Sequence, residues 1–358
     1  MLRLSLLPLV AALATSGSAF ARAYSEVEAC FVLDTTGSMS AMIETAKEKV
    51  WFIANQIVNA RSRPGLKLCL TAYRDRGDEY ITRRLDLTDD IDDFYQHLSE
   101  LKAAGGGDTP ESVNQALLET VTLTSWGQQP DTLRVIFLIG DAPPHTDYDE
   151  PQYKDIAQLA WNRQIVINPV LVGSHAAARA IWQDIAATAE GENLRIAAPD
   201  TSRVSSTPVD QDLIALNSRM GRLIVPYGQP AVRDAVLAKQ DRSEDLSDAA
   251  LADRLSFNLR TGRVVQGSGD LIHDMDSGLV TADAINADWL PEGMRSMTEA
   301  ELLLRLGQIR AERQEIQALV ASLLDERRVL LDKQRPGEGF EHLVSQVIVQ
   351  QMSRSDHP

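Results

Sequence analysis

The stretch that most constrains the fold of this chain is residues 28–39, EACFVLDTTGSM. A short apolar run, residues 29–33, ends abruptly in Asp34, and small polar residues and a glycine follow it. Such runs are typical of strands buried in a parallel sheet, and binding loops lie at the carboxyl ends of these strands. The residues from Ser40 onward have helical periodicity. This stretch therefore predicts a strand, a turn and a helix.

The turn carries oxygen-bearing side chains at alternate positions, Asp34, Thr36 and Ser38. Alternate residues of a tight turn can face one point, and carboxylate and hydroxyl oxygens suit a hard cation such as Mg²⁺. The segment 34–38, DTTGS, resembles the Asp-x-Ser-x-Ser metal-ion-dependent adhesion motif of von Willebrand factor A domains, with Thr36 in place of the middle serine. The resemblance covers roughly residues 24–226 and implies a Rossmann-like α/β domain.

The pattern of apolar residues supports this fold class, because strand-like and helix-like segments alternate along the chain. After the first strand, strands are expected at residues 66–73, 80–85, 133–139, 165–172 and 194–197. Helices are expected at residues 40–57, 89–101, 110–121, 177–189 and 210–223. This alternation predicts a doubly wound, mostly parallel sheet with helices on both faces.

A second loop, residues 103–111, contains three consecutive glycines that let the backbone approach a ligand closely. The resemblance implies a threonine ligand in this segment, but Gly107 stands at its usual position, so that Thr109 or Asp108 would take the role. The segment also resembles the Asp-x-Pro-Glu of integrin β-subunit domains, in which the glutamate reaches the adhesion metal and the aspartate a neighbouring one. Glu111 and Asp108 match those positions, and all three candidates stay open.

A third loop follows the strongly apolar segment 133–139 and begins with Gly140 and Asp141. The resemblance implies that Asp141 binds the metal through a water molecule. The next residues, 142–148, contain two prolines and are expected to form the rim of the site. His145 in this rim is interpreted as a surface residue rather than a ligand.

The expected chemistry follows from the ligand types. A cation held largely by neutral hydroxyl oxygens and water keeps positive charge and an open coordination position, which an acidic side chain of a partner protein can fill. Mg²⁺ fits best, with Mn²⁺ or Ca²⁺ as alternatives. The sequence thus predicts a cation-dependent protein-binding module and not an enzyme. A metal-assisted phosphatase of the haloacid dehalogenase type needs a second aspartate where Thr36 stands.

The first 21 residues resemble a cleavable export signal. Arg3 precedes an apolar run at residues 4–13, and small residues at 19–21 provide a cleavage site. A membrane anchor or a buried helix is the alternative. Export predicts a periplasmic or secreted protein, and no other apolar run approaches the length of a membrane span. The net charge of −16 argues against a nucleic-acid partner.

The chain has two cysteines, Cys30 and Cys69, and both fall in expected strands. An even number of cysteines in an exported chain favours a disulfide. The resemblance implies that the two strands are neighbours, so that a bridge between them is geometrically feasible. Two buried thiols that pack as small apolar groups are the alternative.

Beyond Pro226 the pattern changes, and residues 230–358 are expected to form a smaller, mainly α-helical region. Its clearest feature is a long amphipathic helix at residues 298–335, which begins with a capping box of Thr298 and Glu301. Its apolar stripe consists of Leu302, Leu306, Ile309, Ile316, Val320, Leu323 and Leu330, with Arg313 and Arg327 on the seam.

This stripe must be buried against another helix. We expect a helical hairpin with residues 339–352 of the same chain, and a coiled-coil homodimer is the alternative. A protein that acts structurally in the envelope through this helical tail is accordingly the second functional hypothesis.

Overall fold

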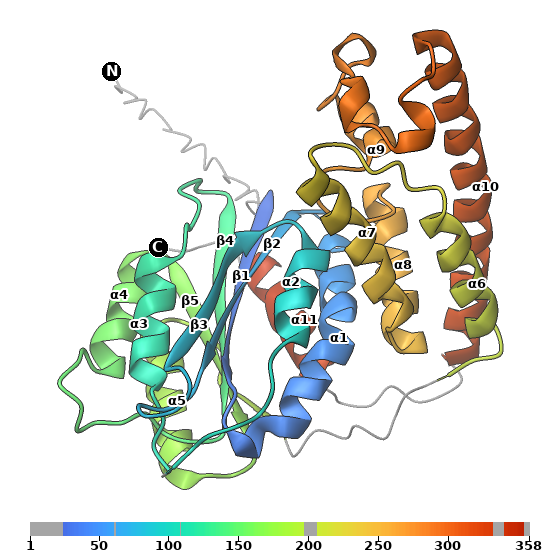
Figure 1. Ribbon diagram of the computed structural model, residues 1–358. Helices are drawn as coiled ribbons and strands as arrows, with labels where there is room; N and C mark the ends of the chain where they lie inside the picture. Colours follow the sequence, from blue (N-terminus) through green and yellow to red (C-terminus); the bar gives the residue numbers. More distant parts are fainter. Residues whose placement is uncertain (1–23, 61, 108, 197–205, 332–339, 354–358) are drawn as a thin grey trace, which may run out of the picture.

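The computed structural model describes residues 24–60, 62–107, 109–196, 206–331 and 340–353 (Figure 1). The expected export signal, residues 1–21, lies outside the described residues, and so does Asp108. Among the described residues, no helix is both long enough and apolar enough to cross a membrane.

A six-stranded sheet in the order β3-β2-β1-β4-β5-β6 forms the centre of the N-terminal domain. The edge strand β3 is antiparallel to β2, and the other neighbours are parallel. The predicted fold class is therefore confirmed. The strands are β1 (Glu26–Asp34), β2 (Gly65–Tyr73), β3 (Thr82–Thr88), β4 (Thr132–Gly140), β5 (Ile165–Val172) and β6 (Leu194–Ile196).

The central strands are buried on both faces, which explains their near-continuous apolar sequences. Asp34 is the last residue of β1 and pairs in register with Tyr73, the last residue of β2. Gly140 ends β4 on the other side of β1. The loops that follow these three strands consequently meet at one edge of the sheet.

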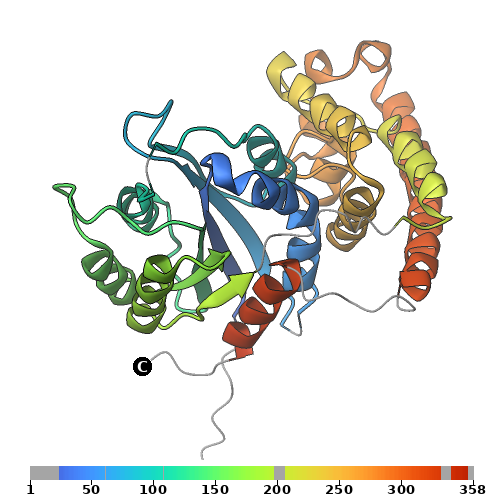
Figure 2. The same cartoon turned by 90° about the horizontal axis from the view of Figure 1, so that it is seen from below.

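Two sets of helices cover the two faces of the sheet (Figures 1 and 2). Helices α1, α2 and α11 bury apolar side chains on one face, and α3, α4 and α5 bury theirs on the other. Their bounds are α1 (Ser40–Val58), α2 (Ile91–Ser99), α3 (Val113–Leu123), α4 (Tyr153–Asn162), α5 (Ala176–Thr188) and α11 (Phe340–Ser353).

A separate helical region packs beside α1 (Figure 1). It consists of α6 (Asp210–Gly221), α7 (Pro230–Glu244), α8 (Asp248–Thr261), α9 (Leu271–Asp276) and α10 (Glu299–Leu331). Phe257 of α8 meets Trp51 of α1 edge to face, with ring centroids 5.8 Å apart. The region also has its own apolar core, in which the stripe of α10 takes part.

The two arginines on the seam of α10 are buried and paired with aspartates of the same region. Arg313 donates two hydrogen bonds to Asp270, at 2.7 and 2.8 Å, and a third to the carbonyl of Leu223. The Nε atom of Arg327 donates to Asp210 at 2.9 Å. These pairs explain how charged residues lie within an otherwise apolar stripe.

The expected hairpin between the long helix and residues 339–352 is wrong. Helix α10 packs against α6 and α8, whereas α11 packs against α1 and β4 of the sheet domain. Both helices are amphipathic, so sequence alone could not decide which apolar surfaces they cover. A homodimer through α10 stays a prediction, although its apolar stripe is already buried within the chain.

Candidate functional site

The first loop folds around the carboxylate of Asp34, which is fully buried at the end of β1. Its Oδ1 atom accepts hydrogen bonds from the backbone N–H of Thr36 at 2.8 Å and from the Thr36 hydroxyl at 2.7 Å. The hydroxyl oxygens of Thr36 and Ser38 are 3.4 Å apart, and Ser38 is exposed. The three predicted first-loop residues therefore present their oxygens to the same small space.

Hydrogen bonds hold the first loop against the neighbouring strand and the glycine-rich loop. The hydroxyl of Thr35 donates to the carbonyl of Tyr73 at 2.9 Å. The carbonyl of Thr35 accepts from the N–H of Ala104 at 3.1 Å, and the N–H of Gly37 donates to the carbonyl of Gly105 at 3.3 Å. The first and second loops thus form one connected backbone unit.

Gly106 explains why the second loop is rich in glycine. Its φ of +85° belongs to the left-handed region. A Cβ atom at this position would lie 3.3 Å from the Cβ atom of Thr36 and 3.4 Å from Oε1 of Glu111. Because Gly106 has no side chain, the side chain of Glu111 can approach Thr36 of the first loop.

At this edge of the sheet, the buried carboxylates of Asp34 and Glu111 each have an oxygen without a hydrogen-bond partner among the described residues, Oδ2 of Asp34 and Oε2 of Glu111. Burial raises the pKa of Asp34 to about 7, against the hydrogen bonds from Thr36 that lower it, and the charge of Asp141 raises it further. Burial also raises the pKa of Glu111 to about 9, with further contributions from Asp34, Asp75, Asp78 and Asp141. Mutual repulsion of this kind is what a bound cation would relieve.

The other predicted ligands differ in their placement. Asp141 follows β4, is half-buried, and lies near enough to act on the pKa of both Asp34 and Glu111. Thr109 is exposed. In the parts of the chain that the structure describes, no three His, Cys, Asp or Glu side chains form a group that could hold a metal ion. A cation at this site would therefore need hydroxyl oxygens and water as ligands in addition to carboxylate oxygens.

Tyr73 is a site residue that sequence reasoning missed. Its hydroxyl is fully buried and makes no hydrogen bond to a described residue. A Cβ atom at Gly140 would lie 2.4 Å from this hydroxyl and 3.5 Å from Oδ2 of Asp34. Gly140, which ends β4, thus leaves room for the side chains of both Tyr73 and Asp34. In the sequence, a glycine directly before Asp141 is the feature that could have indicated this close packing.

The expectation that His145 is a surface residue is wrong, because its side chain is only 6% exposed. Its Nε2 atom lies 3.3 Å from Oδ2 of Asp75, and its Nδ1 atom lies 2.9 Å from Oδ1 of Asp147. The imidazole ring stacks on Tyr148 at a centroid distance of 3.9 Å. Ser112 donates a hydrogen bond to Asp75 as well, at 2.9 Å. The rim loop is therefore anchored through Asp75, at the end of β2.

Cys30 and Cys69 are register partners on β1 and β2, and they form a disulfide in the structure. Their Cα atoms are 4.4 Å apart. Both side chains are buried in the apolar layer beneath α3, α4 and α5. The bridge thus joins the two strands whose carboxyl ends carry the first loop and Asp75.

Comparison with known proteins gives this site a context. Residues 28–201 match the family model of the von Willebrand factor A domain. Over 132 residues the chain is 33% identical to von Willebrand factor A domain-containing protein 7 of Homo sapiens, a stretch that covers 36% of this chain and 13% of the human protein. It is also 30% identical over 122 residues to a putative ariadne-like RING finger protein of Acanthamoeba polyphaga mimivirus, covering 33% of this chain and 11% of that protein.

Among solved structures, the VWA domain of SpRpn10 is similar with a TM-score of 0.38 and 16% identity, over 52% of this chain and 94% of that one. The sheet, its helices and the family match together define the class: residues 28–201 are a von Willebrand factor A (VWA) domain. Domains of this class are commonly protein-interaction modules and typically have no enzymatic activity.

Proposed function

We propose that the loops at the carboxyl edge of the sheet bind a divalent cation, preferably Mg²⁺, and that the cation captures an acidic side chain of a protein partner. The observation that carries this proposal is the pair of buried carboxylates, Asp34 and Glu111, each with an oxygen that accepts no hydrogen bond from a described residue. Two such groups close together favour either protons or a cation. The hydroxyls of Thr36 and Ser38 beside them are the neutral ligands that Mg²⁺ accepts.

Asp34, Thr36 and Ser38 would hold the cation from the first loop, with Asp141 and Glu111 from the neighbouring loops. Asp108 and Thr109 stay candidates of the second loop. When bound, the cation supplies a positive charge with an open coordination position for the carboxylate of the partner. If Glu111 itself is a ligand, its charge makes the cation less attractive to the partner, and the affinity of each contact is lower.

The first test measures cation binding directly, by calorimetric titration of Mg²⁺ and Mn²⁺ into the wild type and two variants. Ser38→Ala removes one hydroxyl from the exposed side of the site, and Asp34→Asn removes a charge. We expect Asp34→Asn to abolish binding and Ser38→Ala to weaken it at least about tenfold, as the loss of one direct ligand implies. Ser40→Ala, two residues further on, is the matched control.

The second test concerns the partner. The protein is used to capture proteins from the extract of the native host, in Mg²⁺ and in EDTA, with Ser38→Ala alongside. A protein that the wild type retains only in Mg²⁺, and that the variant loses, supports the proposal. Equal retention under all three conditions would contradict it and move the function to the helical region.

We also propose that the protein is periplasmic or secreted, because residues 1–21 resemble an export signal. Fractionation of host cells tests this directly. Recovery of the full-length protein from the cytoplasm, with residues 1–21 still attached, would contradict it.

A further inference from the structure

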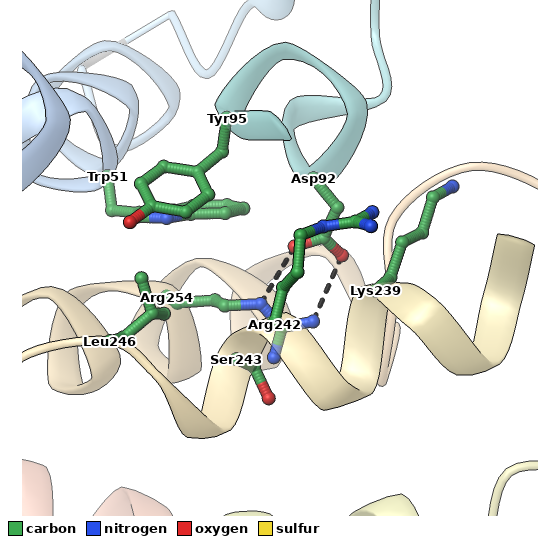
Figure 3. A pocket seen from close by; sticks show the side chains of 8 residues that line it. All are labelled: Trp51, Asp92, Tyr95, Lys239, Arg242, Ser243, Leu246 and Arg254. Atoms are coloured by element: carbon green, nitrogen blue, oxygen red, sulfur yellow. Dashed lines mark hydrogen bonds and ion pairs between the residues drawn. The ribbon is translucent and has the colours of Figure 1, made fainter. Parts of the chain in front are cut away.

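Buried arginines of this protein bind two kinds of partner. Arg254 of α8 donates to the carboxylate of Asp92 in α2 at 2.8 and 3.0 Å, and so joins one side chain to another (Figure 3). Arg74, directly after β2, donates to two backbone carbonyls instead. Its side chain is only 5% exposed. An arginine with such partners fixes the positions of backbone segments relative to each other.

The guanidinium group of Arg74 connects the first loop of the candidate site to the second. Its Nε atom donates to the carbonyl of Thr35 at 3.3 Å, and its Nη2 atom donates to the carbonyl of Lys102 at 2.8 Å. Lys102 directly precedes the glycine-rich loop, residues 103–111. The Thr35 carbonyl also accepts a hydrogen bond from the N–H of Ala104 at 3.1 Å. Arg74 therefore sets the spacing of the two backbone segments that carry candidate ligands.

The peptide group between Thr35 and Thr36 is held on both sides. Its carbonyl accepts from Arg74 and Ala104, whereas its N–H donates to Oδ1 of Asp34 at 2.8 Å. Asp34 and Thr36 are both candidate ligands, so a rotation of this peptide would displace a carboxylate and a hydroxyl of the site. Arg74 thus acts on the geometry of the site through backbone atoms.

The side chain of Arg74 is itself held in place. Its guanidinium carbon lies 4.3 Å from the centre of the Tyr80 ring, and the Tyr80 hydroxyl lies 2.7 Å from that of Thr35. The carbonyl of Arg74 accepts from the N–H of Ser112 at 3.2 Å, just before α3. Glu79 lies 3.4 Å from Nη1, but its side chain is 75% exposed, so this ion pair adds little. Packing and backbone contacts therefore determine where the guanidinium group lies.

We propose that Arg74 determines the preference of this site for Mg²⁺ over Ca²⁺, an inference that rests on the cation binding proposed above. Mg²⁺ requires nearly ideal octahedral geometry with oxygens at about 2.0–2.1 Å, whereas Ca²⁺ accepts variable geometry with oxygens at about 2.3–2.6 Å. A site with ligands on separate loops selects the smaller ion only when the loops keep their spacing. The hydrogen bonds from Arg74 to both backbone segments supply this constraint.

The test compares calorimetric titrations of Mg²⁺ and of Ca²⁺ into the wild type and Arg74→Lys. Lysine keeps the positive charge, but its donors lie on one nitrogen, whereas the arginine reaches the two carbonyls from separate nitrogens. We expect the Mg²⁺ affinity to fall at least about tenfold, as is usual when a group that orients metal ligands is lost. The Ca²⁺ affinity should fall less than about threefold, because Ca²⁺ tolerates a looser arrangement of ligands. The ratio of the two affinities is decisive, since partial unfolding would weaken both equally.

Arg134→Lys is the matched control. Arg134 lies near the start of β4, at the opposite end of the strands from the candidate site. It is also buried, and its Nε and Nη2 atoms likewise donate to two backbone carbonyls, those of Gly127 and Gln129. Its replacement should leave both cation affinities unchanged.

Tyr80→Leu is a second variant, for the case that Arg74→Lys does not fold. It removes the ring that packs on the guanidinium group of Arg74, at a position that is only half-buried. Circular dichroism establishes that each variant is folded before it is titrated. Tyr80→Leu should also lower the Mg²⁺ affinity more than the Ca²⁺ affinity.

The outcomes separate this inference from the proposed function. An unchanged ratio of Mg²⁺ and Ca²⁺ affinities in folded Arg74→Lys, or in Tyr80→Leu if Arg74→Lys does not fold, would overturn the role of Arg74 and leave the proposed function intact. The same change of ratio in Arg134→Lys would also overturn it, since any buried arginine would then have this effect. If the wild type binds neither cation, the proposed function itself fails, and the role of Arg74 fails with it.

Discussion

Asp34 and Tyr73 share a small buried space that exists because β4 ends in a glycine. Their side chains come from adjacent strands, and neither finds a partner for all of its polar atoms among the described residues. The side chains of Asp34 and Tyr73 are therefore positioned by close packing as much as by hydrogen bonds. Substitution of Gly140, whose lack of a side chain creates this space, tests the role of packing.

Gly140→Ala should destabilise the domain by about 1–3 kcal/mol, because the new methyl group would overlap the Tyr73 hydroxyl. It should also weaken cation binding, since the methyl group approaches Oδ2 of Asp34. Chemical denaturation and Mg²⁺ titration measure the two effects. Gly307→Ala, on the exposed side of α10 with open space around it, should instead stabilise by about 0.5–1 kcal/mol. If both variants had the same stability, crowding at Gly140 would not be the cause.

The residues of the first loop could be predicted because their spacing is local. The sequence placed Asp34, Thr36 and Ser38 in one turn, and the structure brings their oxygens together. The burial of His145 could not be predicted, because it depends on Asp75 at the end of a different strand. Which of the second-loop candidates faces the first loop also could not be predicted, because it depends on the backbone conformation of the three glycines. In the structure, Glu111 lies beside Thr36.

At the scale of elements, periodicity predicted the strands of the sheet and most of the helices around it. Helix α4 was not predicted, and the edge strand β3 begins at Thr82 instead of residue 80 and continues to Thr88. Tyr80 lies outside the strand and contacts the first loop instead, because its hydroxyl lies 2.7 Å from that of Thr35. Apolar periodicity cannot distinguish a strand residue from one that supports a loop.

Helix α10 offers a comparison between a buried and an exposed ion pair on the same element. Arg313→Met should destabilise the helical region by about 3–5 kcal/mol, because it leaves the buried carboxylate of Asp270 without its partner. Arg310→Met should cost less than about 1 kcal/mol, since the Arg310–Asp276 pair is largely exposed. Urea denaturation followed by circular dichroism measures both. A cost for Arg313→Met no greater than that for Arg310→Met would contradict the burial of this pair.

At the scale of the whole molecule, the helical region and α11 both depend on α1 of the sheet domain. The docking of α11 involves residues far apart in sequence, such as the reciprocal amide hydrogen bonds between Asn168 and Gln351, at 3.2 and 2.8 Å. The spacing of apolar residues within one helix gives no information on contacts with residues so far away in the sequence. For this reason the sequence predicted helix α11 but not that it covers the sheet domain.

The docking of α11 can be tested with two neighbouring residues. Ile348 is fully buried against the sheet domain, whereas Val349 is 41% exposed. Ile348→Ala should destabilise the sheet domain by about 2–5 kcal/mol, and Val349→Ala by less than about 0.5 kcal/mol. The unfolding of both variants is followed by tryptophan fluorescence. Equal costs would show that α11 does not pack as described.

The contact between α8 and α1 should make stability depend on pH through Asp253. Burial raises its pKa to about 7, against the attraction of Arg327 and Lys49. A carboxyl whose pKa is higher in the folded state contributes stability below its unfolded pKa of about 3.9, and this contribution is lost as the pH rises to about 7. Asp253→Asn should therefore stabilise the protein at pH 8 by about 2 kcal/mol and have little effect near pH 4.

Thermal unfolding of Asp253→Asn at the two pH values checks this prediction. Asp241→Asn, an exposed carboxylate of α7, is the control and should change the stability little at either pH. A gain from Asp253→Asn that is the same at both pH values would contradict the role of its ionisation.

The return of α11 to the sheet has a consequence for the order in which the molecule can assemble. The ribosome releases β1, α1 and β4 long before residues 340–353 have been synthesised. Until then the apolar surface that receives Phe340, Val344 and Ile348 stays uncovered. The core of the N-terminal domain can therefore close only after residues 340–353 have been synthesised. During that interval it presents an apolar surface of the kind that chaperones bind.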